Sequence, residues 1–156
     1  MKIFFAFLFS TFFSVSTFGC KQSETELMSC SFQGEGNRNV SFRMNNETQK
    51  ISYSFSKNGE DELRVLFDEK NMLKRAIDKE NNITYYGFNR GKYSYIINII
   101  NGKGFNEYSI SFSIKYSNKV IQSNDCLGNS YKASNINSKY IKDVPFNFVG
   151  GEFQFP

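Results

Sequence analysis

The stretch Tyr108-Ser109-Ile110-Ser111-Phe112-Ser113-Ile114-Lys115-Tyr116 carries a large apolar side chain at every second position, with small or polar side chains between them. This period of two is typical of a half-buried β-strand. Working outward, similar runs are separated by Asn- and Gly-rich turns such as Asn58-Gly59, which favours a tight hairpin. The predicted strands are 27–32, 40–44, 51–56, 63–67, 83–88, 93–100, 108–116 and 119–126. The chain is therefore predicted to be all-β: an antiparallel meander of about eight strands, closed as a small barrel or a sandwich.

Two segments do not follow this pattern as clearly. Asp68 would cap a helix that places Met72, Leu73, Ala76 and Ile77 on one face, but a strand over 72–77 is equally compatible with the residues. The strand is the preferred interpretation, because every neighbouring segment is a strand. From about residue 127 the pattern decays into an irregular Asn-, Ser- and Gly-rich segment, and the aromatic tail 144–156 is expected to pack on the domain.

The N-terminus predicts export. Lys2 precedes an apolar run of about 16 residues, and Gly19 closes that run before the chain turns polar. A positive start, an apolar middle and a small exit residue are typical of a secretory signal peptide, and the run is shorter than the roughly 20 apolar residues of a spanning helix. The predicted organisation is a signal peptide over 1–19, a tether over 20–26 and a single β domain over 27–156.

The residue after the predicted cleavage point is a cysteine. Gly19-Cys20 resembles the lipobox of bacterial lipoproteins, whose cysteine is acylated and becomes the new N-terminus, although Thr17 and Phe18 depart from its usual residues. A lipidated Cys20 would place the protein in the periplasm or on the outer membrane, with the lipid as its contact with the membrane. Without lipidation, Cys20 is a thiol or disulfide partner of a periplasmic or secreted protein.

The cysteines number three, and disulfides persist in an exported protein. Lipidation of Cys20 would leave Cys30 and Cys126 as an even pair that closes almost the whole domain. The competing pair, Cys20 with Cys30, would close a small loop.

Composition excludes several chemistries. The chain has no histidine, so Ser-His-Asp and Cys-His catalysis and histidine zinc sites are absent. The net charge of +4 includes Lys2 and is spread evenly, so nucleic-acid binding is not expected. No cofactor, metal site or catalytic residue is predicted. The acidic residues of 60–62 together with Asp68-Glu69 leave a hydrolase with paired carboxylates as an alternative.

One aromatic and basic cluster is a candidate partner-binding site. It surrounds a predicted hairpin and consists of Tyr85, Tyr86, Arg90, Tyr93 and Tyr95. Tyr and Arg are the residues that commonly anchor protein interfaces. The alternative is that these tyrosines are ordinary core and sheet-face residues.

Several short motifs carry a resemblance. Cys30-Ser31-Phe32, Val40-Ser41-Phe42, the run 53–59 and Glu62-Leu63 look like the opening of small uncharacterised envelope proteins of Gram-negative bacteria. The plan of lipoprotein leader, small β domain and late disulfide also resembles periplasmic lysozyme inhibitors of the membrane-bound type. Those carry a Ser-Gly-x-x-Tyr loop, which the run 128–131 (Gly-Asn-Ser-Tyr) does not reproduce.

These observations favour a non-enzymatic protein of the cell envelope that binds a macromolecular partner, as an inhibitor or immunity protein against a toxin or hydrolase. The alternatives are a small barrel enclosing an apolar ligand, suggested by 18 Phe and 9 Tyr residues, and the hydrolase named above.

Overall fold

The computed structural model describes residues 23–34, 36–104, 107–149 and 152–156, and these form strands and loops without a helix. Nine longer strands come first in the chain, and four short strands follow them. They are β1 (Glu24–Phe32), β2 (Arg38–Asn45), β3 (Ile51–Lys57), β4 (Glu60–Phe67), β5 (Leu73–Asp78), β6 (Ile83–Arg90), β7 (Tyr93–Asn101), β8 (Tyr108–Tyr116), β9 (Lys119–Asp125), β10 (Tyr131–Lys132), β11 (Ile141–Asp143), β12 (Asn147–Val149) and β13 (Glu152–Gln154). In the described part of the chain, no helix is long and apolar enough to cross a membrane.

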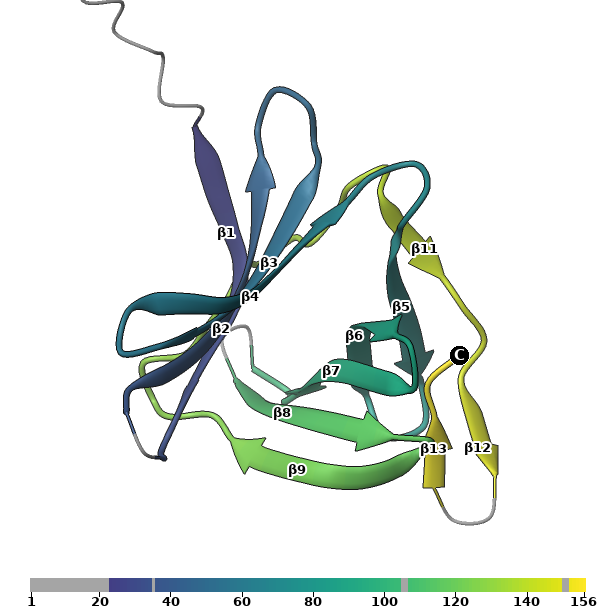
Figure 1. The fold of residues 1–156 in the computed structure, drawn as a ribbon. Coiled ribbons are helices and arrows are strands. Elements are labelled where there is room, and N and C mark those ends of the chain that lie inside the picture. The colour runs from purple at the N-terminus through teal and green to yellow at the C-terminus, as the bar shows by residue number, and fades with distance from the viewer. Residues whose placement is uncertain (1–22, 35, 105–106, 150–151) are drawn as a thin grey trace, which may run out of the picture.

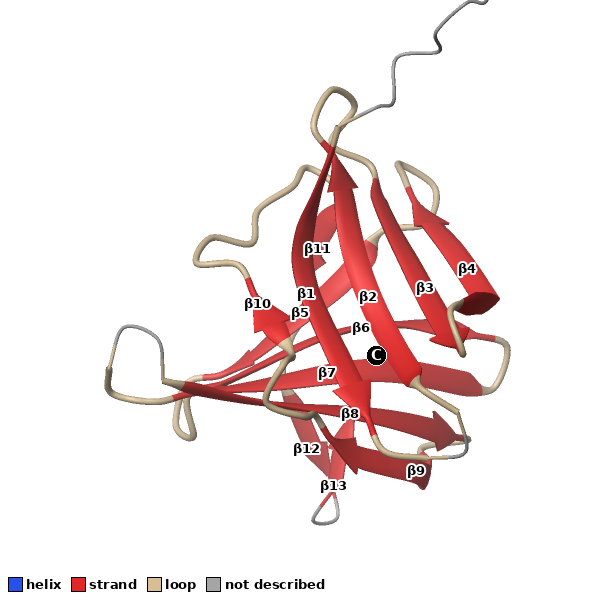
Figure 2. Cartoon of the chain, turned by 90° about the vertical axis from the view of Figure 1, so that its left-hand side faces the viewer, coloured by secondary structure: helices blue, strands red, loops and turns tan. Residues whose placement is uncertain are grey.

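The strands form two main sheets. The first sheet has the order β10-β1-β2-β3-β4, and the second has the order β11-β5-β6-β7-β8-β9. The neighbouring long strands of each sheet are antiparallel, whereas β11 lies parallel to β5. The strands of one sheet run across those of the other (Figures 1 and 2). The described strands thus form a sandwich of two open sheets rather than a closed barrel.

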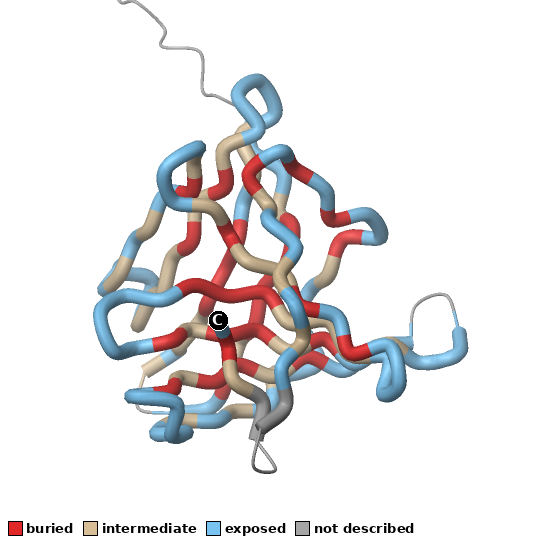
Figure 3. Tube along the Cα trace, turned by 90° about the vertical axis from the view of Figure 1, so that its right-hand side faces the viewer, coloured by how far each residue is buried: buried red, intermediate tan, exposed pale blue. Residues whose placement is uncertain are grey.

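Aromatic side chains fill the space between the sheets. Tyr53 of β3 meets Phe88 of β6 with ring centroids 4.9 Å apart, and Phe67 lies 5.3 Å from the same ring. Phe32 of β1 stacks on Phe112 of β8 at 5.7 Å. All five side chains are buried. Buried segments gather in the interior of the fold, and exposed segments lie mainly at the loops (Figure 3). Each such pair contributes about 0.5–1.5 kcal/mol beyond the burial of its area.

The Cys30–Cys126 disulfide joins β1 of the first sheet to the end of β9 in the second, with the two Cα atoms 5.1 Å apart. Backbone hydrogen bonds continue this junction, because the amide of Leu127 donates to the carbonyl of Ser31 and that of Ala133 to Leu27. The segment after Cys126 therefore binds along β1 and supplies β10. It then reaches β5, where it forms β11.

The final residues cover the outer face of the second sheet. Phe155 is 4 % exposed and packs with Ala76 and Ile96, and Phe146 stacks on Tyr85 with centroids 5.6 Å apart. Gly87 makes room for this tail, because a Cβ there would lie 3.0 Å from Phe155 Cζ and closer still to the carbonyl oxygen of Tyr95. The tail is thus part of the packed domain, as the sequence predicts.

An ion pair fixes β11 beside β5. The guanidinium of Arg75 binds the carboxylate of Asp143, with Nη2 2.9 Å from Oδ2. These hydrogen bonds lower the pKa of Asp143 below its usual range. The two residues are direct partners in the parallel register, so the sequence-distant strand has a defined position.

Two expectations need correction, and one alternative left open by the sequence is decided. β1 begins at Glu24, inside the expected tether 20–26, because β2 is long enough to pair with it as far as Asn45. The segment from about 127 contains β10 to β13 rather than being irregular, since it pairs along strands distant in sequence. Residues 73–78 form strand β5, as preferred, and Asp68 accepts hydrogen bonds in a turn instead of capping a helix.

The disulfide is predicted to supply a large share of the stability. Its two cysteines are 96 residues apart in sequence, so opening it frees a long loop in the unfolded chain. A Cys30→Ser, Cys126→Ser double variant should lose about 4 kcal/mol of unfolding free energy, measured by urea denaturation. Cys20→Ser is the matched control and should unfold like the parent, and equal stability of the double variant would contradict the prediction.

Gly87 is predicted to be intolerant of any side chain. Gly87→Ala should lower the unfolding free energy by about 1–3 kcal/mol, because the added methyl collides with the backbone at Tyr95 and with Phe155. Gly128 is the control, since a Cβ there meets nothing within 4 Å. Denaturation curves of the two alanine variants should therefore differ, and coincident curves would refute the close packing of the tail.

Candidate functional site

Two hairpin tips lie together at one end of the second sheet. Gly91 has a φ of +61° in the β6–β7 hairpin, and Ser117 and Asn118 have φ values of +46° and +68° in the β8–β9 hairpin. Positive φ at both central residues, as at Ser117 and Asn118, is the requirement of a type I′ turn, whereas glycine at the first central residue, as at Gly91, is typical of a type II′ turn. The amide of Ser117 donates to the carbonyl of Lys92, with a nitrogen-to-oxygen distance of 2.9 Å, so the tips are linked.

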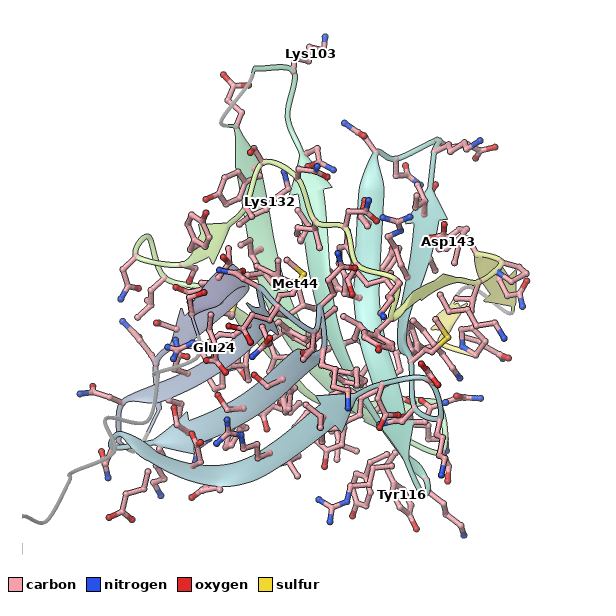
Figure 4. The ribbon with its side chains drawn as sticks, turned by 90° about the horizontal axis from the view of Figure 1, so that it is seen from above. Glu24, Met44, Lys103, Tyr116, Lys132 and Asp143 are labelled. Carbon is pink, nitrogen blue, oxygen red and sulfur yellow. A yellow bond between two sulfur atoms is a disulfide. The ribbon has the colours of Figure 1, made fainter. Side chains whose placement is uncertain are left out.

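An exposed pair of tyrosines occupies this end. Tyr93 of β7 and Tyr116 of β8 are direct cross-strand partners, and their ring centroids are 4.9 Å apart. Their exposed fractions are 42 % and 40 %, although their strands contribute buried residues further along. Tyr116 lies at the tip of the sheet, at the end opposite Lys103 (Figure 4).

A cleft of about 310 Å³ opens between the sheets beside these tips. The first sheet contributes Phe55, Glu62 and Leu63, and the second contributes Arg90, Tyr95 and Ile114. Four of these side chains are apolar or aromatic, and one charge of each sign lies among them. We call the cleft together with Tyr93 and Tyr116 the hairpin-end surface.

The structure divides the five residues of the predicted cluster. Arg90, Tyr93 and Tyr95 belong to the hairpin-end surface, because the two-residue period of β6 and β7 puts them on the face toward the first sheet. Tyr86 shares that face but is 5 % exposed and hydrogen-bonds Arg75. Tyr85 points to the opposite face, against Phe146. Desolvation raises the pKa of both Tyr85 and Tyr86 above the usual range.

The acidic residues do not converge. Asp61 lines a polar hollow on the outside of the first sheet, whereas Glu62 lines the cleft, because successive strand residues face opposite sides. Asp68 accepts hydrogen bonds from the amides of Lys70 and Asn71, and these lower its pKa. A general acid requires the opposite shift. The geometry of the described residues therefore gives no support to paired-carboxylate hydrolysis.

The described residues contain no group of three or more His, Cys, Asp or Glu side chains arranged to hold a metal ion. The lipidation residue predicted at Cys20 lies outside the described residues. The sequence matches no family model, and no curated protein or solved structure is similar enough to count as a match.

Sequence reasoning missed most of the cleft. Phe55, Leu63 and Ile114 are identified by the sequence only as strand residues, because nothing local indicates that the β3–β4 hairpin lies opposite β6 to β8. The position of Tyr116 could have been predicted from the sequence. The turn at Ser117-Asn118 and the hairpin at Arg90 together place Tyr116 beside Tyr93.

A buried tyrosine lies near the cleft. Tyr53 is fully buried, precedes Phe55 by two residues on the same face, and has a hydroxyl without a hydrogen bond to any described residue. Desolvation, with a smaller contribution from Tyr95, raises its pKa far above the usual range. A buried polar group without a partner is destabilising.

This contrast between two buried tyrosines is testable. Tyr53→Phe removes an unpaired hydroxyl and should raise the unfolding free energy by about 1 kcal/mol. Tyr86→Phe is the matched control: it removes a hydroxyl that bonds Arg75 and should lower the unfolding free energy by a similar amount. Urea denaturation measures both, and a loss of stability in Tyr53→Phe would show that the hydroxyl has a partner in solution.

Proposed function

We propose that this protein is an exported, non-enzymatic protein of the cell envelope that binds a macromolecular partner and acts as an inhibitor or immunity protein against a toxin or hydrolase. The observation that carries the proposal is the hairpin-end surface, where exposed Tyr93 and Tyr116 adjoin a cleft lined by apolar side chains, Arg90 and Glu62. Tyr and Arg beside a pocket are typical of the energetic centre of a protein interface.

The tight turns and cross-links of the site support a surface that is already ordered before a partner binds. Both tips are tight turns linked by a backbone hydrogen bond, and the sheets are joined by the Cys30–Cys126 disulfide. A surface that is ordered before binding loses less conformational entropy on association. An inhibitor gains affinity from that pre-organisation.

The alternative of an enclosed apolar ligand receives less support. The space between the sheets is occupied by buried aromatic side chains, among them Phe42, Tyr53 and Phe112. The cleft beside the hairpin tips is a surface feature lined by both charges and apolar groups. Such a mixed surface suits a protein partner better than an apolar molecule.

Site-specific photo-crosslinking in the native host tests the proposal. A benzophenone amino acid that replaces Tyr93 should give a covalent adduct with one envelope or secreted protein, because the side chain at position 93 would be buried in the complex. Tyr131 is the matched control, being 43 % exposed against 42 % for Tyr93 but lying on β10. A specific interface at the hairpin end would be refuted if positions 93 and 131 captured the same proteins. It would also be refuted if neither position captured any protein.

A further inference from the structure

The second sheet ends in an exposed edge at β9. β9 pairs with β8 on one side, and no described strand pairs with its other side. The other sheet edges differ: β10 and β11 are two and three residues long, and β4 carries Glu60, Asp61, Glu62 and Arg64. Charged side chains on an edge strand discourage pairing with another chain. The charged residues of β9 are its two terminal residues, Lys119 and Asp125, so the middle of this strand carries no charge.

Apolar side chains on β9 are also exposed. Val120 and Ile121 have exposed fractions of 52 % and 58 %, the latter at the β-bulge that interrupts pairing with β8. Lys119 pairs with Tyr116, so this end of β9 continues the hairpin-end surface. A partner bound to the tyrosines would therefore reach β9 directly.

The backbone of β9 offers hydrogen bonds to such a partner. The amide of Cys126 donates to the carbonyl of Ile110 on β8. Inward and outward backbone groups alternate along an antiparallel pair, so Asn124 and Gln122 also face β8. The N–H and C=O groups of Ser123 and Asp125 then point to the free edge.

The charges around the tips are mainly positive. Arg90, Lys92 and Lys119 lie on the two hairpins, and Glu62 is the acidic residue of the adjoining cleft. None of these four residues forms an ion pair with another described residue. The salt bridge in the described part of the chain joins Arg75 and Asp143, on β5 and β11. Asp125 stands at the opposite end of β9. This asymmetry favours a segment whose acidic side chains lie beside Lys119.

We propose that β9 is a docking edge for an extended segment of the protein partner, which adds as a further strand to the second sheet. Its apolar side chains meet Val120 and Ile121, and its acidic side chains meet Arg90, Lys92 and Lys119. Main-chain hydrogen bonds supply affinity in this mode, and the side-chain pockets supply specificity. The inference rests on the proposed function, because it specifies how the partner at the hairpin end is held.

Amide NMR with a defined probe tests the docking edge without knowledge of the partner. The probe is a synthetic peptide of alternating valine and glutamate. It should cause saturable shifts at the amides of Ser123 and Asp125 and slow their hydrogen exchange by about tenfold or more at saturation. Ser123→Pro should abolish both effects at the amide of Asp125, because proline removes an outward donor and is tolerated on an edge strand, while Ser123→Ala should retain them.

A charge-reversal variant keeps the test valid if the proline variant unfolds. Lys119→Glu should weaken binding of the valine–glutamate peptide and favour its valine–lysine counterpart. Several results would overturn the proposal: no response at Ser123 and Asp125, exchange protection that grows with protein concentration alone and so indicates a second copy, or binding to phosphatidylglycerol vesicles by this edge in place of the peptide.

The crosslinking assay separates this inference from the proposed function. If Ser123→Pro leaves the Tyr93 adduct unchanged, the partner binds but does not add a strand to β9, and the inference alone falls. If the Tyr93 position gives no adduct in the parent protein, the proposed function fails. Loss of the adduct in Ser123→Pro, with retention in Ser123→Ala, is the expected result.

Discussion

The structure depends on the covalent and hydrogen-bonded junction between β1 and the end of β9. Cys30 and Cys126 fix one corner of the sandwich, and the backbone bonds from Leu127 to Ser31 and from Ala133 to Leu27 extend that corner along β1. Two sheets whose strands run across each other share a limited contact area, so a fixed corner determines how their remaining edges face each other. The distance between β4 and the β6–β7 hairpin, and hence the cleft, follows from this constraint.

The aromatic core complements the junction. Phe and Tyr side chains from both sheets meet edge to face, as Tyr53 and Phe67 do against Phe88. Such rings have few rotamers and specific preferred contacts, so they order the interior with a small loss of side-chain entropy. Along β7 the same face changes from buried Ile97 through half-buried Tyr95 to exposed Tyr93. The hairpin-end surface is thus the continuation of the core beyond the end of the first sheet.

Local sequence was sufficient for the strands but not for their long-range arrangement. The alternation in β8 and the turn at Asn58-Gly59 each depend on neighbouring residues, and both were predicted correctly. The parallel pairing of β11 with β5 depends on Arg75 meeting Asp143, which lies 68 residues further along the chain, and no periodicity signals it. The same reason explains the candidate site: Arg90, Tyr93 and Tyr95 belong to one hairpin, whereas Phe55 and Leu63 join them through sheet packing.

The C-terminal segment explains why the hairpin end and β9 remain open. Phe146 and Phe155 cover the outer face of β5 to β7, where Lys74 and Asn89 both donate to the backbone oxygen of Pro156. The chain therefore covers one apolar face of the second sheet with its own residues, yet leaves Tyr93, Tyr116, Val120 and Ile121 exposed along the adjoining end and edge. Exposed apolar side chains gathered at one end of a sheet are typical of a surface that a partner buries. Their concentration in one region, next to tight turns and to cations that form no ion pair with a described residue, is the physical argument for an interface there.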